Sequence, residues 1–206
     1  FVAPFFNVYM LENLGIKYFT VFILSQFVSN LATILFVRVW GGFADKYGNK
    51  PVLIICGTGM AVVSFFWCLA TPDNYLWVVP VIHILAGTFW PGCDISGTNM
   101  AIWLAPEKNR SAYIAMYTLA ASLVGGGLAY ICGGAFMEIT GSYLAGLKIP
   151  FLFGYNFNNY HSLFLIAGIV RLVAVYIFLQ RVHDGHFSTQ QLLKDVSNQL
   201  KAGKNS

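Results

Sequence analysis

Residues 41–50 read GGFADKYGNK and lie between two long apolar segments. A short charged stretch with glycines in that position predicts a tight loop between two membrane-spanning helices. It contains one acid, Asp45, and two basic residues, Lys46 and Lys50. The basic residues also bear on the orientation of the chain, because positive charge collects on the cytoplasmic side of a membrane.

The composition predicts a membrane protein. Of 206 residues, 57% are hydrophobic and only 10% are charged, whereas soluble domains carry roughly 25% charged residues. The net charge of +4 is too small and too scattered to indicate nucleic-acid binding. The four cysteines stand apart inside apolar stretches, which argues against a disulfide framework and a metal site. We expect no cofactor.

Five stretches are long and apolar enough to span a bilayer, which takes about 20 residues each. We expect spans at 18–40, 51–70, 75–104, 111–137 and 161–182. Residues 1–11 look like the second half of a further span, so we interpret the chain as a fragment of a longer protein. Residues 138–160 predict a mixed loop. Residues 183–206 predict a polar tail, either a short interfacial helix or a disordered segment.

The basic residues predict the orientation of the spans. One side of the predicted membrane collects nine of the twelve: Arg38, Lys46, Lys50, Lys108, Arg110, Arg181, Lys194, Lys201 and Lys204. The opposite side has only Lys17 and Lys148. The positive-inside rule then places the loops 41–50 and 105–110 and the C-terminus in the cytoplasm. We expect an integral, multi-pass protein of the cell (inner) membrane.

The pattern G-x-x-x-D-[RK]-x-G-x-[RK], in a cytoplasmic loop between two spans, resembles the signature loop of the major facilitator superfamily. The matching positions are Gly41, Asp45, Lys46, Gly48 and Lys50. Asn49 departs from the pattern, since the family usually has a basic residue there. The resemblance implies an all-α membrane fold of two six-helix halves. The number of spans and the polar tail match the C-terminal half, helices seven (partial) to twelve, with the bundle at residues 1–182 and the tail at 183–206.

The resemblance also implies a function. It is secondary active transport of a small-molecule substrate by alternating access, in which two halves rock about a site at the middle of the membrane. We expect coupling to protons. The partners would be the substrate, the lipid bilayer and the missing N-terminal half of the same chain, with no nucleic acid. A non-transporting polytopic scaffold or receptor on the same bundle is the alternative. No nucleophile and base cluster together, so we expect no enzyme.

The motif residues have physical roles that can be read without the family. Gly41 lets a neighbouring helix approach closely, and Asp45 can accept from the free N–H groups of a helix N-terminus. Gly48 can adopt a positive φ in a tight turn. Lys46 and Lys50 face the anionic inner leaflet, which favours each by about 1 kcal/mol. The resemblance implies that this cluster latches the cytoplasmic face in one conformation.

Polar residues within the spans are candidates for a substrate or proton path: Asp94, Gln26, Asn30, His83, Asn99 and Asn7. Asp94 is the best candidate proton carrier, because an ionisable residue at membrane depth indicates function; a structural, protonated aspartate is the alternative. Gln26 and Asn30 share a helix face and either line a path or bond to a neighbouring helix. A lone His83 in an apolar span is more often structural.

Two further features of the spans predict packing. Arg171 lies near the middle of the last span and needs a partner, for which Asp94 and Glu138 are candidates; we expect a structural intramembrane charge. In the fourth span a series of small residues at intervals of four predicts a face for close helix packing. This series is Gly125, Ala129 and Gly133. We favour packing within the bundle over dimerisation.

Overall fold

The structure, a computed structural model, describes residues 2–144 and 157–178. Regular structure in these two ranges is entirely helical. The first half contains α1 (Ala3–Glu12), α2 (Tyr18–Phe22), η1 (Ile23–Val28), α3 (Ser29–Tyr47), α4 (Asn49–Phe66) and η2 (Trp67–Leu69). The second half contains α5 (Tyr75–Leu104), α6 (Arg110–Ala121), η3 (Ser122–Leu128), α7 (Ala129–Leu144), α8 (Asn159–Val173) and η5 (Ala174–Phe178). The segments η1, η3 and η5 are π-helical, and η2 is a 3₁₀ turn.

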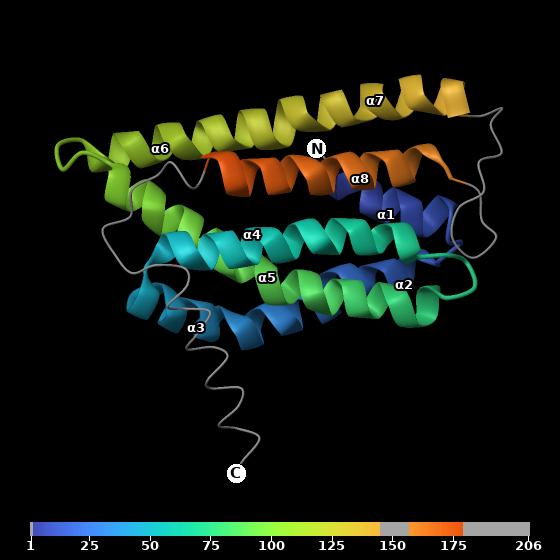
Figure 1. Cartoon of the computed structure of the whole chain (residues 1–206), viewed down its shortest axis with the longest axis horizontal. Coiled ribbons are helices and arrows are strands. Elements are labelled where there is room, and N and C mark those ends of the chain that lie inside the picture. The colour runs from blue at the N-terminus through green and yellow to red at the C-terminus, as the bar shows by residue number, and fades with distance from the viewer. Residues whose placement is uncertain (1, 145–156, 179–206) are drawn as a thin grey trace, which may run out of the picture.

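The helices form an elongated bundle with their axes roughly along its length (Figure 1). Helix α5 packs against both α3 and α4, and α4 packs against α8 on its other side. The run α6–η3–α7 lies along one side of the bundle, where α7 is next to α8. Short α1 lies toward the right-hand end of the bundle in Figure 1, beside α8, and its Phe6 ring stacks on Phe164 of α8 with centroids 5.0 Å apart.

The five predicted spans are confirmed as helices. Five helical runs in the described residues are long and apolar enough to cross a membrane: Tyr18–Tyr47, Asn49–Leu69, Tyr75–Leu104, Arg110–Tyr143 and Asn159–Ile177. Hydropathy locates these runs because a helix satisfies all its backbone groups internally, and only such elements and closed barrels tolerate lipid. The predicted interfacial helix and the rest of the tail at 183–206 lie outside the described residues.

The prediction of a ten-residue loop at 41–50 is wrong. Helix α3 continues to Tyr47, and α4 begins at Asn49, so a single residue joins them. Gly48 has φ 90° and ψ 164° and donates its N–H to the carbonyl of Ala44 over 2.9 Å. The helix continues because neither glycine nor charge breaks its hydrogen bonds. Ala44 and Tyr47 also bury their side chains in a small core with Trp40, Val52 and Cys56.

The mixed loop predicted at 138–160 is also too long. Residues from Glu138 to Leu144 continue α7, and α8 begins at Asn159 behind the N-cap Asn158. The Asn158 side chain accepts from the backbone N–H of His161, and the Asn158 N–H donates to His161 Nδ1. This reciprocal cap satisfies N–H groups that a helix start leaves without intrahelical partners. The predicted span end at 179–182 lies outside the described residues.

A buried polar network ties α1 to α8 at the same end of the bundle. Tyr9 Oη donates to the carbonyl of Ala70 over 2.8 Å and lies 3.3 Å from His161 Nε2. Because His161 Nδ1 accepts from Asn158, the neutral ring carries its proton on Nε2 and donates it to Tyr9. Three separate chain segments therefore meet at one tyrosine hydroxyl.

Close helix packing occurs at glycines outside the predicted small-residue series. A Cβ at Gly87 in α5 would overlap the carbonyl oxygen of Ser29 and lie 2.7 Å from the Cβ of Ala32. A Cβ at Gly168 in α8 would lie 2.5 Å from the ring of Phe65. In contrast, Gly125 has no neighbour within 4 Å in the described part of the chain. Ala129 is half-buried and Gly133 is buried. The predicted packing face is therefore partly covered at these two residues but not closely packed at Gly125.

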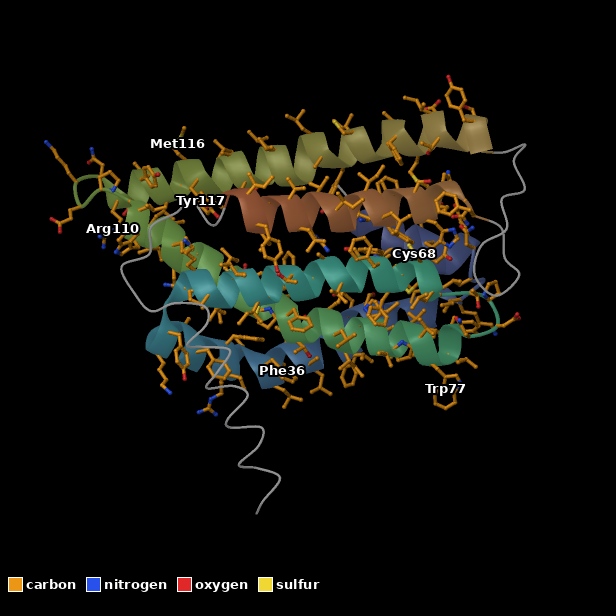
Figure 2. The ribbon with its side chains drawn as sticks, viewed as in Figure 1. Phe36, Cys68, Trp77, Arg110, Met116 and Tyr117 are labelled. Carbon is orange, nitrogen blue, oxygen red and sulfur yellow. The ribbon has the colours of Figure 1, made fainter. Side chains whose placement is uncertain are left out.

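Large apolar side chains cover much of the outer surface. Only 6% of the most apolar window of Arg110–Tyr143 is buried, and Met116 on α6 points away from the bundle (Figure 2). On α5, Trp77 likewise projects outward and is 80% exposed. A soluble monomer rarely exposes such large apolar patches, so these faces are suited to lipid or to another protein surface.

Candidate functional site

A cavity of about 580 Å³ lies between α1, η1, α3, α4, α5 and α8. We call it the central cavity. The polar residues that line it come from helices far apart in the sequence: Asn7, Ser25, Gln26, Ser29, Asn30, Thr33, His83, Asp94 and Arg171. Polar groups inside membrane-spanning helices are costly unless they face a cavity or one another. Their convergence makes this cavity the candidate functional site.

Most of the predicted path residues therefore share one location. Asn7, Gln26, Asn30, His83 and Asp94 all line the central cavity. Asn30 also donates its side-chain amide to the carbonyl of Gln26, so part of its polarity is satisfied within its own helix.

Asn99 lies elsewhere. Its Nδ2 donates to Asn49 Oδ1 over 3.0 Å, and Asn49 is the first residue of α4. This bond links α5 to the joint between α3 and α4. The sequence could not separate Asn99 from the other polar residues, because its partner lies 50 residues earlier in the chain.

Asp94 is exposed and faces two cavities. Besides the central cavity it lines a second one of about 520 Å³, whose other walls include Tyr117, Thr118 and Ser122 of the α6–η3 run. We call this the α6 cavity. Within residues 2–144 and 157–178, no hydrogen bond or ion pair holds the Asp94 carboxylate. An unpaired carboxylate at this depth can exchange a proton or meet a cation.

Arg171 is bound to neutral groups on α4. Its Nη1 donates to Ser64 Oγ over 2.8 Å and to the carbonyl of Met60 over 3.0 Å. The candidate partners Asp94 and Glu138 are not bonded to it. Arg171 thus ties α8 to α4, as a structural charge would, but it also lines the central cavity.

His83 is buried and lines the central cavity. Its ring meets the Trp67 ring edge-on, with centroids 5.8 Å apart and an interplanar angle of 89°. Nε2 of His83 is buried and has no hydrogen-bond partner among the described residues. A buried ring nitrogen without a partner costs stability, which favours a ligand or water as its natural partner.

Trp90 is a site residue that the sequence analysis missed. It lines both the central and the α6 cavity, and its side chain is 55% exposed. Tryptophan in membrane proteins is usually an anchor at the interface, whereas Trp90 lies near the middle of α5 (Tyr75–Leu104). Its distance from both ends of the predicted span was the signal that could have identified it.

The motif residues lie at the other candidate site, around the α3–α4 joint. Asp45 and Lys46 are exposed, and the Lys46 ammonium lies 4.6 Å from the centroid of the Tyr47 ring. Gly41 has open space within 4 Å, so no helix of the described chain approaches it closely. A helix that packs against Gly41, or whose N-terminal N–H groups donate to the Asp45 carboxylate, would therefore come from outside the described residues.

Comparison with known proteins decides the family. The family model of the Major Facilitator Superfamily matches residues 1–199. The chain belongs to the major facilitator superfamily. The resemblance drawn from residues 41–50 is therefore confirmed. No solved structure gives a significant match.

Several curated relatives of this superfamily chain have names that describe efflux. The "Multi-drug resistance efflux pump PmrA" of Streptococcus pneumoniae is 30% identical over 170 residues, which cover 81% of this chain and 37% of that protein. A PmrA homolog of Lactococcus lactis is 26% identical over 208 residues, or 96% of this chain and 45% of that protein. The "Tetracycline resistance protein, class H" of Pasteurella multocida is 27% identical over 139 residues, covering 66% and 31%. The chain spans less than half the length of these relatives.

Proposed function

We propose that the protein is a proton-coupled secondary transporter that moves a small organic molecule by alternating access. The observation that carries this proposal is the central cavity. It lies within membrane-spanning helices and is lined by polar side chains of α1, η1, α3, α5 and α8. A bundle that served only as a scaffold would have no need to keep such groups together at membrane depth.

Asp94 is the proton carrier in this proposal. Its carboxylate reaches the central and the α6 cavities and has no bonded partner among the described residues. Asp94 can therefore bind a proton while its cavity is open to one side of the membrane and release that proton once the cavity is open to the other side. Protonation also removes the charge, which lowers the cost of moving the carboxyl through an apolar environment.

Export of drug-like molecules is the direction that the relatives support. Their printed names describe multi-drug efflux and tetracycline resistance. The central cavity, with Trp67 and Trp90 among polar groups, has the mixture of apolar surface and a few polar groups that binds such molecules. Proton entry would then drive export.

Orientation and assembly complete the proposal. The distribution of basic residues supports a cytoplasmic position for the α3–α4 joint and the C-terminus, with the protein in the cell (inner) membrane. The run α6–η3–α7 is poorly buried, which supports it as the surface that packs against the N-terminal half of a twelve-helix transporter. Residues 1–182 would then form the C-terminal bundle, and residues 183–206 its tail. Gly41 and Asp45 would contact that half. Together with Lys46, Gly48 and Lys50 they would form a latch on the cytoplasmic face.

The test separates driven transport from exchange in proteoliposomes that contain the protein. We expect Asp94→Asn to abolish substrate transport driven by a proton gradient while substrate–substrate exchange persists, because the amide still contacts the substrate but carries no proton. Glu107→Gln is the matched control, since Glu107 lies exposed in the α5–α6 turn, outside the cavities. Unchanged driven transport in Asp94→Asn would remove the proton role, and wild-type protein that binds but never moves substrate would favour the scaffold or receptor reading.

A further inference from the structure

A third cavity adjoins Arg171, and no residue of α4 lines it. It has a volume of about 480 Å³ and lies between the start of α1, the middle of α5, the η3–α7 run and α8. We call it the α8 cavity. Its walls are mostly apolar, with Val2, Ile166 and Val170 among them, and they include the aromatic rings of Trp90 and Tyr130. Among the described residues that line it, Arg171 is the only charged one.

The guanidinium of Arg171 is held in a fixed position by one of its nitrogens. Nη1 donates to Ser64 Oγ and to the carbonyl of Met60, and Ser64 Oγ itself donates to the same carbonyl over 3.1 Å. The hydroxyl hydrogen of Ser64 is therefore bonded to the Met60 carbonyl, and the lone pairs of the Ser64 oxygen accept from Arg171. This triangle of bonds on one turn of α4 orients the planar group.

The remaining donors of Arg171 have no protein partner. Nε and Nη2 make no hydrogen bond with the described residues, and neither is sealed off from the surrounding space. Ser64 and Met60 are neutral, so the positive charge is not compensated by them. Asp94 lines the central cavity but not the α8 cavity. A cation at membrane depth with free donors is stabilised when an anion supplies the missing bonds.

We propose that the α8 cavity is a substrate subsite that binds a carboxylate on Arg171 and an attached aromatic or apolar body against Trp90 and Tyr130. The carboxylate pairs with Nε and Nη2, whose geometry suits a two-point contact. This subsite rests on the proposed transport function. With Asp94 in the neighbouring cavity, it selects molecules that carry an acid group in addition to any basic one.

The depth of Arg171 favours a substrate over a lipid headgroup as the anion. Arg171 lies in the interior of the span Asn159–Ile177, six residues from its nearer described end at Ile177. At roughly 1.5 Å of rise per residue this is about 9 Å along the helix, which places the start of the side chain in the hydrocarbon and not in the headgroup layer. The phosphate of a lipid stays at the interface, so it would have to leave its preferred depth to reach this side chain.

The test compares two dyes that differ in one group. A rhodamine ethyl ester is a monocation, and its free acid has the same aromatic body with a carboxylate. Binding of each to the protein in phosphatidylcholine nanodiscs is followed by fluorescence polarisation. We expect Arg171→Gln to weaken binding of the free acid by about tenfold to a hundredfold, as the loss of a charge-assisted hydrogen bond implies, and to leave the ester nearly unchanged. Arg171→Lys should restore part of the difference.

The controls separate the possible results. Lys17→Gln removes one positive charge from an exposed position outside the cavities and should change neither dye. Equal loss of both dyes in Arg171→Gln would overturn the subsite and leave Arg171 with a structural role. Competition by added phosphatidylglycerol against the free acid would also overturn it, in favour of a lipid phosphate. Dye binding needs no proton gradient, so this experiment tests the subsite independently of transport. Failure of the transport proposal would appear in a different experiment, as the absence of substrate exchange in liposomes.

Discussion

Replacing Gly87 by alanine should open the contact between α5 and the start of α3. The new Cβ would overlap the carbonyl oxygen of Ser29 and lie 2.7 Å from the Cβ of Ala32. The carbonyl belongs to the backbone and cannot rotate away, so the helices must separate. Overpacking of this kind costs about 1–3 kcal/mol, while glycine to alanine in a helix returns about 1 kcal/mol.

Gly125→Ala isolates the packing effect. Gly125 is also helical but has no neighbour within 4 Å in the described residues, so this variant keeps only the propensity gain. The two variants should therefore differ by about 1–3 kcal/mol. For a chain of this size that corresponds to a difference of about 2–12 °C in Tm.

The measurement is thermal unfolding of the detergent-solubilised protein, followed by the loss of the monodisperse peak in fluorescence-detected gel filtration. Gly87→Ala should unfold at a lower temperature than Gly125→Ala. Ser29 lines the central cavity, so Gly87→Ala should also weaken substrate binding. Equal Tm values for the two variants would show that the α3–α5 contact is not as close as the structure has it.

Two other stability predictions use the same assay. Gly48→Ala should destabilise the protein by about 1–3 kcal/mol, because φ 90° and ψ 164° lie in a region that only glycine adopts readily. Gly42→Ala is the control, since Gly42 lies in open space within α3 and its replacement should not destabilise the protein. Equal Tm values for the two variants would refute backbone strain at Gly48. Tyr9→Phe should cost about 1–3 kcal/mol, because it removes the buried hydroxyl that bonds to the Ala70 carbonyl and to His161 Nε2. Tyr160→Phe removes only an exposed bond to Glu12, and a larger effect for Tyr160→Phe would contradict the network.

The spans could be predicted from the sequence because the requirement for them is local. About 20 apolar residues in succession meet a bilayer as a helix whatever surrounds them. The exact ends could not be predicted in the same way. Residues 41–47 carry two glycines and two charges, yet they stay helical because Ala44 and Tyr47 pack against α4. That packing depends on the position of α4 relative to α3, which a local pattern does not contain.

The candidate site could be predicted in part for a related reason. Asn7, His83 and Asp94 were conspicuous because each is polar within an apolar helix, but their meeting in one cavity depends on how α1 and α5 are arranged. Asn99 was equally conspicuous and bonds to Asn49 instead. Trp90 was missed because its apolar ring does not stand out in an apolar span. The sequence thus marks polarity, and the fold decides what that polarity faces.

The joint at Gly48 has a mechanical consequence. Because Gly48 alone joins α3 to α4, only its φ and ψ angles lie between the two helices. The side chains of Trp40, Tyr47 and Val52 pack together beside this joint and hold α3 and α4, the two arms of a hairpin, against each other. We expect the arms to tilt as one rigid hairpin, so that spin labels placed on α3 and α4 keep a constant separation while the rest of the bundle moves. A tilt that displaces Gln26 at one wall of the cavity then also shifts Ser64, and with it the anchor of Arg171.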